Sequence, residues 1–270
     1  MSTTQEVPVT APQDTSPHTT HAPIPFTRIL GVELRKMFDT RSGFWLMASI
    51  AILAVIATAA TIIFSPSETL TYGNFAGAIG TPMAVILPIV AILSVTSEWS
   101  QRSALTTFTL VPNRQRVISA KLLLTVAIGA ASMVLALTVG AVGNLIGTAI
   151  AGVDPTWEVS VREVAQIILA NEIGVLIGFM LGVLLRSSAG AIVGYFVYSL
   201  VLPTISGALA STQQWYADNA GWIDLNWTTF QLFDSTLSRT EWTQLGVAST
   251  IWLVIPLTVG LILVRRSEVK

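Results

Sequence analysis

Residues 122–146 read LLLTVAIGAASMVLALTVGAVGNLI, a stretch of 25 residues without a charged side chain. At about 1.5 Å per residue, an α-helix of this length crosses the roughly 30 Å of a bilayer's hydrocarbon core. Five further apolar stretches of similar length lie at residues 43–64, 75–97, 164–185, 189–209 and 245–264. The sequence therefore predicts an all-α fold, a polytopic membrane bundle of six transmembrane helices.

The composition of the whole chain agrees with a membrane protein. Of its 270 residues, 52% are hydrophobic and 11% are charged, against about 25% charged in a soluble domain. The formal net charge of −1 argues against nucleic acid as a partner. Cysteine is absent and both histidines, His18 and His21, lie in a proline-rich tail, which argues against metal sites and Ser-His catalysis. Nucleotide-binding motifs are also missing, so the chain is not expected to be an enzyme or to hydrolyse ATP alone.

Both ends of the chain are predicted to be tails outside the membrane. Residues 1–25 contain five prolines and no apolar period, a composition typical of disorder. They lack the basic and apolar regions of a cleaved signal peptide. Residues 265–270 form a short tail after the last span.

Residues 26–41 are too short and too charged to span a membrane. Their apolar side chains recur at helical spacing opposite Arg28 and Arg35, which predicts an amphipathic helix lying flat at the cytoplasmic interface. Glu33 falls on the apolar side, where a lone carboxylate is costly. Two interpretations stay open: Glu33 bonds Lys36 or an interfacial water, or it makes a specific contact with another cytoplasmic loop.

The basic residues indicate the orientation in the membrane. All but two of the 14 Lys and Arg residues lie before the first span, between spans two and three, between spans four and five, or after span six. Only Arg162 and Arg239 lie on the other side. Since basic residues collect on the cytoplasmic side, both termini are expected in the cytoplasm, with the chain in the cytoplasmic membrane. Between spans five and six, on the other side, four tryptophans favour contact with the outer leaflet.

The loop at residues 98–122, EWSQRSALTTFTLVPNRQRVISAKL, is the stretch that bears most directly on function. Leu105, Phe108 and Val111 are three residues apart, which predicts a short helix with one apolar stripe, ended by Pro112. A short helix between two spans is a suitable lever, because whatever pushes it moves both spans.

This loop resembles that of the type-2 permease family of ATP-binding-cassette exporters. In that family an acidic residue closes the second span, a threonine-containing segment follows, and Pro-x-Arg and a Lys open the third span. The matching residues here are Glu98, Thr106, Thr107, Pro112, Arg114 and Lys121. Two further stretches agree, Glu33-x-x-Lys36 in the amphipathic helix and GVLLRSSAGAIVG at residues 182–194.

The resemblance implies a six-span permease half in the lipid bilayer, paired as a homodimer or with a similar chain. Two ATPase subunits would dock on its cytoplasmic face and bind ATP and Mg, so this chain would hold no cofactor. The loop after span two would be a coupling helix, and the amphipathic helix, with Glu33 and Lys36, would also touch the ATPase. The tryptophan-rich loop resembles the re-entrant helices that close the outer gate. The residues expected to couple to the ATPase are Glu98, Arg102, Leu105, Phe108, Pro112 and Arg114.

Small residues and prolines recur inside the spans. The glycines favour ordinary packing within one bundle, with a dimer seam or a sliding surface for the substrate as alternatives. The prolines are interpreted as kinks that fit packing or act as flexing points. The glycines fall four or three residues apart, and they and the prolines are Gly140, Gly143, Gly147, Gly174, Gly178, Gly182, Gly190, Gly194, Pro82, Pro88, Pro203 and Pro256.

Glu172 is the one carboxylate far from either end of a span, about 13 Å into the membrane. Asn171 or Asn144 could supply a polar neighbour. Glu172 is either a cavity-lining or ion-sensing group, or a protonated structural group. It supports an alternative function, a proton-coupled secondary transporter, although no inverted repeat is evident. A membrane scaffold without transport activity is the third possibility.

Overall fold

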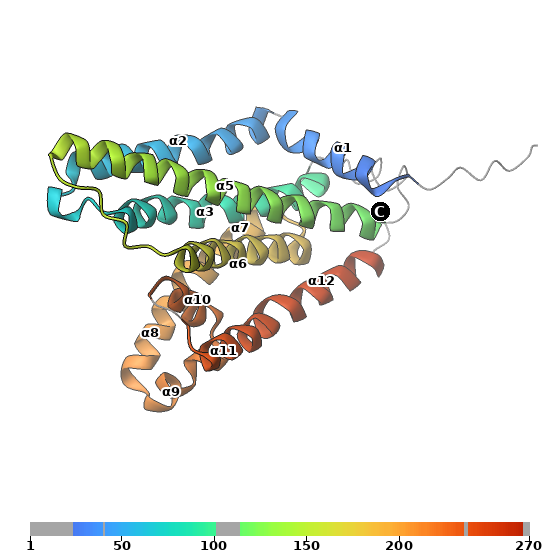
Figure 1. The fold of residues 1–270 in the computed structure, drawn as a ribbon. Coiled ribbons are helices and arrows are strands. Elements are labelled where there is room, and N and C mark those ends of the chain that lie inside the picture. Colours follow the sequence, from blue (N-terminus) through green and yellow to red (C-terminus); the bar gives the residue numbers. More distant parts are fainter. Residues whose placement is uncertain (1–23, 40, 101–113, 235–236, 267–270) are drawn as a thin grey trace, which may run out of the picture.

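The computed structural model describes residues 24–39, 41–100, 114–234 and 237–266, and in these ranges the chain is helical without a β-strand (Figure 1). Six stretches are long and apolar enough to cross a membrane: Gly43–Phe64, Tyr72–Ser97, Gln115–Ala151, Val161–Leu185, Ser188–Thr212 and Arg239–Val264. The predicted all-α bundle of six transmembrane helices is confirmed. The chain is a multi-pass membrane protein.

The first four spans lie side by side (Figure 1). They are α2 (Arg41–Phe64), α3 (Tyr72–Ser100), α5 (Arg114–Ala151) and α6 (Val161–Leu185), and a single 3-10 turn, Ser67–Thr69, follows α2. The short helix α1 (Phe26–Asp39) packs against α2 and α5 at one end of the bundle, which we call the α1 end. Helix α3 ends there and α5 begins there (Figure 1). The position of α1 at a membrane surface stays a prediction.

The helices of the spans begin before the apolar stretches that predict them, and two of them, α6 and α11 (Arg239–Ser249), start with a capping box. The Ser160 hydroxyl accepts from the Glu163 backbone N–H, and the Glu163 carboxylate accepts from the Ser160 N–H, which starts α6 at Val161. Ser238 and Glu241 form the same pair at the start of α11. Such boxes satisfy backbone N–H groups that a helix leaves free at its start.

Glycines let the spans approach closely. A Cβ built on Gly178 in α6 would lie 2.6 Å from the Pro88 carbonyl oxygen of α3, so only glycine fits there. Gly174 and Gly182 lie against the same helix. Glycines of the third span meet Phe75 and its neighbours, and these are Gly140, Gly143 and Gly147. These glycines pack within one bundle.

Pro88 also frees a carbonyl that another helix uses. A proline has no N–H for the carbonyl one turn earlier, which here belongs to Ala84. The Tyr195 hydroxyl from α7 (Ser188–Phe196) donates to the Ala84 oxygen at 2.7 Å. The Ala84 carbonyl, which Pro88 leaves without its helical donor, therefore accepts a hydrogen bond from a side chain of the fifth span.

The fifth and sixth spans each contain a wide π-helical turn. The fifth runs through α7, the π turn Val197–Val201 and α8 (Leu202–Thr212). The sixth runs through α11 (Arg239–Ser249), the π turn Thr250–Val254 and α12 (Ile255–Arg266). The turns close with hydrogen bonds from the Leu202 N–H to the Val197 carbonyl and from the Ile255 N–H to the Thr250 carbonyl. A proline comes directly after each donor, Pro203 in the fifth span and Pro256 in the sixth, so the change in helical hydrogen bonding accompanies a proline in both spans.

The two π turns contact each other and the segment between them. The rings of Tyr198 and Trp252 have centroids 6.4 Å apart. The Asn226 amide donates to the Tyr198 carbonyl at 3.1 Å, and the Trp252 indole N–H donates to the Ile223 carbonyl at 2.7 Å. The segment at residues 223–226, between the fifth and sixth spans, is thus bonded to both of them.

The tryptophan-rich segment forms two short helices, α9 (Gln214–Ile223) and α10 (Leu225–Asp234). Asp224 separates them, because its Oδ1 accepts from the backbone N–H groups of Asn226 (2.8 Å) and Trp227 (3.3 Å) at the start of α10. Figure 1 shows them at the end of the molecule opposite α1. Their contact with the outer leaflet stays a prediction.

Candidate functional site

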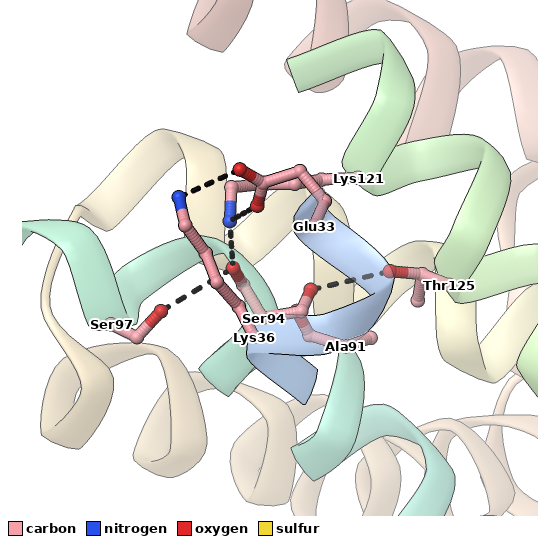
Figure 2. Close-up of polar contacts among 7 residues, drawn as sticks. All are labelled: Glu33, Lys36, Ala91, Ser94, Ser97, Lys121 and Thr125. Carbon is pink, nitrogen blue, oxygen red and sulfur yellow. Dashed lines mark hydrogen bonds and ion pairs between the residues drawn. The ribbon is translucent and has the colours of Figure 1, made fainter. Parts of the chain in front are cut away.

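Helix α1 is anchored to the bundle by a buried ion pair. The Glu33 side chain faces inward and only 3% of the residue is exposed. Its Oε2 lies 2.6 Å from the Nζ of Lys121, and its Oε1 lies 2.7 Å from the Nζ of Lys36 (Figure 2). Both interpretations of Glu33 therefore apply at once: it bonds Lys36 in its own helix and Lys121 beyond the loop after span two.

Lys121 extends the contact to a third helix. It is 6% exposed, and its ammonium also donates to the Ser94 carbonyl oxygen of α3 at 2.9 Å (Figure 2). Ser94 in turn lies beside α5, with its Oγ 3.2 Å from the Thr125 Oγ1. These side chains connect α1, the last turns of α3 and the first turns of α5. We call Glu33, Lys36, Lys121 and Ser94 the Glu33 cluster.

The electrostatics of the cluster keep the Glu33 carboxylate charged. Burial alone would raise its pKa, but the ammonium of Lys121 and the hydrogen bonds from Lys121 and Lys36 outweigh burial, so the pKa of Glu33 lies below its usual range. Removing one member of a buried ion pair leaves the other charge without compensation. The cluster therefore holds α1 in one position more firmly than an exposed ion pair would.

The structure describes only part of the predicted coupling loop at residues 98–122. Arg102, Leu105, Phe108 and Pro112 lie outside the described residues. Glu98 is in the last turn of α3 and Arg114 is the first residue of α5. The Glu33 cluster thus lies on the two helices that lead into and out of this loop.

The intramembrane polar residues are not brought together as suggested. The Asn144 amide donates to the Thr156 carbonyl at 3.1 Å, in the segment between α5 and α6, so Asn144 fastens that segment. The Asn171 amide donates to Ile167 in its own helix at 2.9 Å. Over the described parts of the chain, neither carboxylate oxygen of Glu172 has a hydrogen-bond partner. The suggestion that Asn144 or Asn171 supplies a polar neighbour to Glu172 is therefore wrong.

The Glu33 cluster joins α1, α3 and α5 through ion pairs and a hydrogen bond. In the described ranges, no group of three His, Cys, Asp or Glu side chains is placed to hold a metal ion. Sequence reasoning missed the ion pair of Glu33 with Lys121, and the hydrogen bond from Lys121 to the Ser94 carbonyl oxygen. Lys121 was the available signal in the sequence, because it directly precedes the apolar stretch of span three and a buried lysine needs a partner.

Comparison of the chain with protein-family models and with curated proteins finds no match.

Proposed function

We propose that this chain is the transmembrane permease subunit of an ATP-binding-cassette exporter. It moves a hydrophobic or amphipathic substrate across the cytoplasmic membrane, and a separate ATPase subunit, which binds ATP and Mg, supplies the energy. The observation that carries the proposal is the contact between Glu33 and Lys121, 2.6 Å apart.

This contact fits a coupling device because of where it lies. It fastens α1 to α5, and Lys121 fastens α5 to α3 through Ser94. Helix α3 ends at Ser100 and α5 begins at Arg114, each within about two turns of this joint. A partner that pushes α1 or the loop between α3 and α5 would therefore move spans two and three together. A mere connector would not need a buried ion pair.

The α1 end is the cytoplasmic end in this proposal. Nearly all the Lys and Arg residues lie in segments at that end, and the helix directions then bring both termini there. The ATPase would dock at the α1 end, with Leu105 and Phe108 as its apolar contacts.

The partner within the membrane is a second copy of the chain or a similar permease. Span five is mostly exposed and apolar, with Val193 and Leu200 at 62% and 60% exposure. The first span has a similar face, with Val55 at 57% and Ile63 at 70%. Lipid and a second permease would share these faces.

Co-purification tests the proposal. The chain is expressed with a candidate ATP-binding-cassette ATPase from the same genome, as wild type, as Phe108→Ala and as Leu123→Ala, a matched loss of an exposed apolar side chain on α5. The wild type should retain the ATPase, and Leu123→Ala should behave like it. Phe108→Ala should weaken the complex about 30-fold, since losing one interface anchor costs on the order of 2 kcal/mol.

Two results would contradict the proposal. If no ATPase accompanies the wild type, the chain is not such a permease. If Phe108→Ala recovers as much ATPase as wild type, and ATP hydrolysis by the complex is unchanged, the loop is not the docking site.

A further inference from the structure

A buried carboxyl group lies in the middle of the bundle without a hydrogen-bond partner among the described residues. Glu172 in α6 is 9% exposed, and both of its carboxylate oxygens are fully buried. No described residue hydrogen-bonds either oxygen. An ionised carboxylate in such a place is very costly, so the group must bind a proton or a cation or face water.

A glycine makes room for this carboxyl. Glu172 lies against Gly129 of α5, where an added Cβ would collide with Oε1. Met133 of α5 and Val175 of α6, each about one turn from Gly129 or Glu172 along its helix, belong to the buried apolar core. Among the described residues no group of three His, Cys, Asp or Glu side chains could hold a metal ion, which favours a proton over a metal cation at Glu172.

Polar side chains lead from the α1 end to this carboxyl. Lys121, Thr125 and Gly129 follow one another at four-residue spacing, so they lie on one face of α5, about 6 Å apart along the axis. Thr125 is buried, and its Oγ1 lies 3.2 Å from the Oγ of Ser94, whose backbone carbonyl oxygen accepts from the Lys121 ammonium. We call Lys121, Ser94 and Thr125 the polar column.

We propose that Glu172 is a proton-binding site in the bundle core, and that it exchanges its proton with the α1 end through the polar column. The inference does not depend on an ATPase partner. The Ser94 hydroxyl donates to the Ala91 carbonyl oxygen at 2.7 Å, so it must turn when a proton passes. The hydroxyls of Ser94 and Thr125 would each accept one proton and donate another, so neither changes its charge. Glu172 alone changes, from −1 to 0. The levels of Thr125 and Gly129 are about 6 Å apart along the α5 axis, and a bridging water would complete the path there.

The surrounding charges are compatible with this assignment. The positive charge of Lys121 would favour the ionised form of Glu172. However, the Glu33 carboxylate lies 2.6 Å from the Lys121 ammonium and offsets that charge. Tyr195 of α7 lies near Gly174, and its hydroxyl proton goes to the Ala84 oxygen. The other titratable groups on helices packed against α6, and on α6 itself, lie at the helix ends: Tyr72, Glu98, Arg114, Arg116, Arg162, Glu163, Asp234, Arg265 and Arg266.

Proton release would alter packing between two spans. Once ionised, Glu172 can no longer rest unsolvated against Gly129, and water must enter between α5 and α6. The pH at the α1 end would therefore bias how closely these spans pack.

Reaction with dicyclohexylcarbodiimide tests the site, because this apolar reagent modifies protonated carboxyl groups inside membranes. The full chain in lipid vesicles should be modified at Glu172, and the modification should decline as the pH is raised. Glu172→Gln should lose the label. Glu33, which is paired and ionised, should not be labelled. No labelling of Glu172 at acid pH, or labelling that does not change with pH, would overturn the proposal.

Infrared spectroscopy after a rapid pH jump tests the path. The carbonyl stretch of the protonated acid, assigned by its loss in Glu172→Gln, should appear more slowly in Thr125→Val, which keeps the side-chain shape but removes the hydroxyl. Thr138→Val is the matched control, since Thr138 is exposed on the same helix and donates to Val134. If Thr125→Val and Thr138→Val both follow wild-type kinetics, the polar column does not carry the proton and the proposed path is wrong.

Discussion

The Oε2 atom of Glu33 and the Nζ atom of Lys121 are 2.6 Å apart, although they belong to an N-terminal helix outside the spans and to the third span. Both residues are buried, so the contact is shielded from the water that weakens exposed ion pairs. Together with the hydrogen bond from Lys121 to the Ser94 carbonyl oxygen, it links α1, α3 and α5 at the α1 end.

Glu33→Gln should destabilise the protein, because it leaves the Lys121 ammonium buried without its counter-charge. We expect a loss of about 3 kcal/mol in the free energy of unfolding, measured by denaturation in mild detergent. Asp39→Asn is the matched control, as it removes a carboxylate from an exposed position on the same helix. An equal, small loss in both variants would show that the pair contributes no more than a surface charge.

The same pair predicts an acid-sensitive stability. Because the folded state holds the pKa of Glu33 below its ordinary value, its stabilising contribution is fully present above that ordinary pKa, near 4.3. The contribution is lost as the pH falls through the lower, folded pKa. The unfolding free energy of the wild type should thus fall more steeply in this acid range than that of Glu33→Gln. Parallel curves for the two proteins would contradict the assignment.

Gly178→Ala should force α3 and α6 apart. The new Cβ would lie 2.6 Å from the Pro88 carbonyl oxygen, and overpacking of this kind costs about 1–3 kcal/mol. Gly80→Ala is the control, since a Cβ at Gly80 meets nothing within 4 Å and alanine is the better helix former. Thermal unfolding of both variants should move in opposite directions. Equal stability of the two would mean that the α3 and α6 contact is looser than described.

Labelling of single cysteines tests the orientation, because the chain has none of its own. An impermeant maleimide added to intact cells should reach Asp218→Cys and should not reach Arg35→Cys, as both positions are exposed and lie at opposite ends. Asp224 would be a poor probe, since it is only 8% exposed. The reverse labelling pattern would invert the proposed topology.

The sequence predicts the spans well because length and apolarity alone decide them. It also contains the helix starts at Ser160 and Ser238, since a Ser followed three residues later by Glu is a local signal. The π turns are less visible, because only the prolines after them stand out. The partner of Glu33 could not be derived, since it depends on how α1 folds back onto α5. Asn144 was misassigned because its partner is a backbone carbonyl of Thr156, which carries no sequence signal.

We propose above all that the Glu33 cluster transmits the conformational change of the ATPase to spans two and three. The most direct measurement is the distance between spin labels at Asp154→Cys and Asp218→Cys, two exposed sites at the end opposite α1, in the complex with its ATPase. We predict that trapping ATP on the ATPase changes this distance in wild type and in Asp39→Asn. In Glu33→Gln the ATPase should remain bound while the distance stays as it was. The same ATP-dependent change in Glu33→Gln as in wild type would contradict the account.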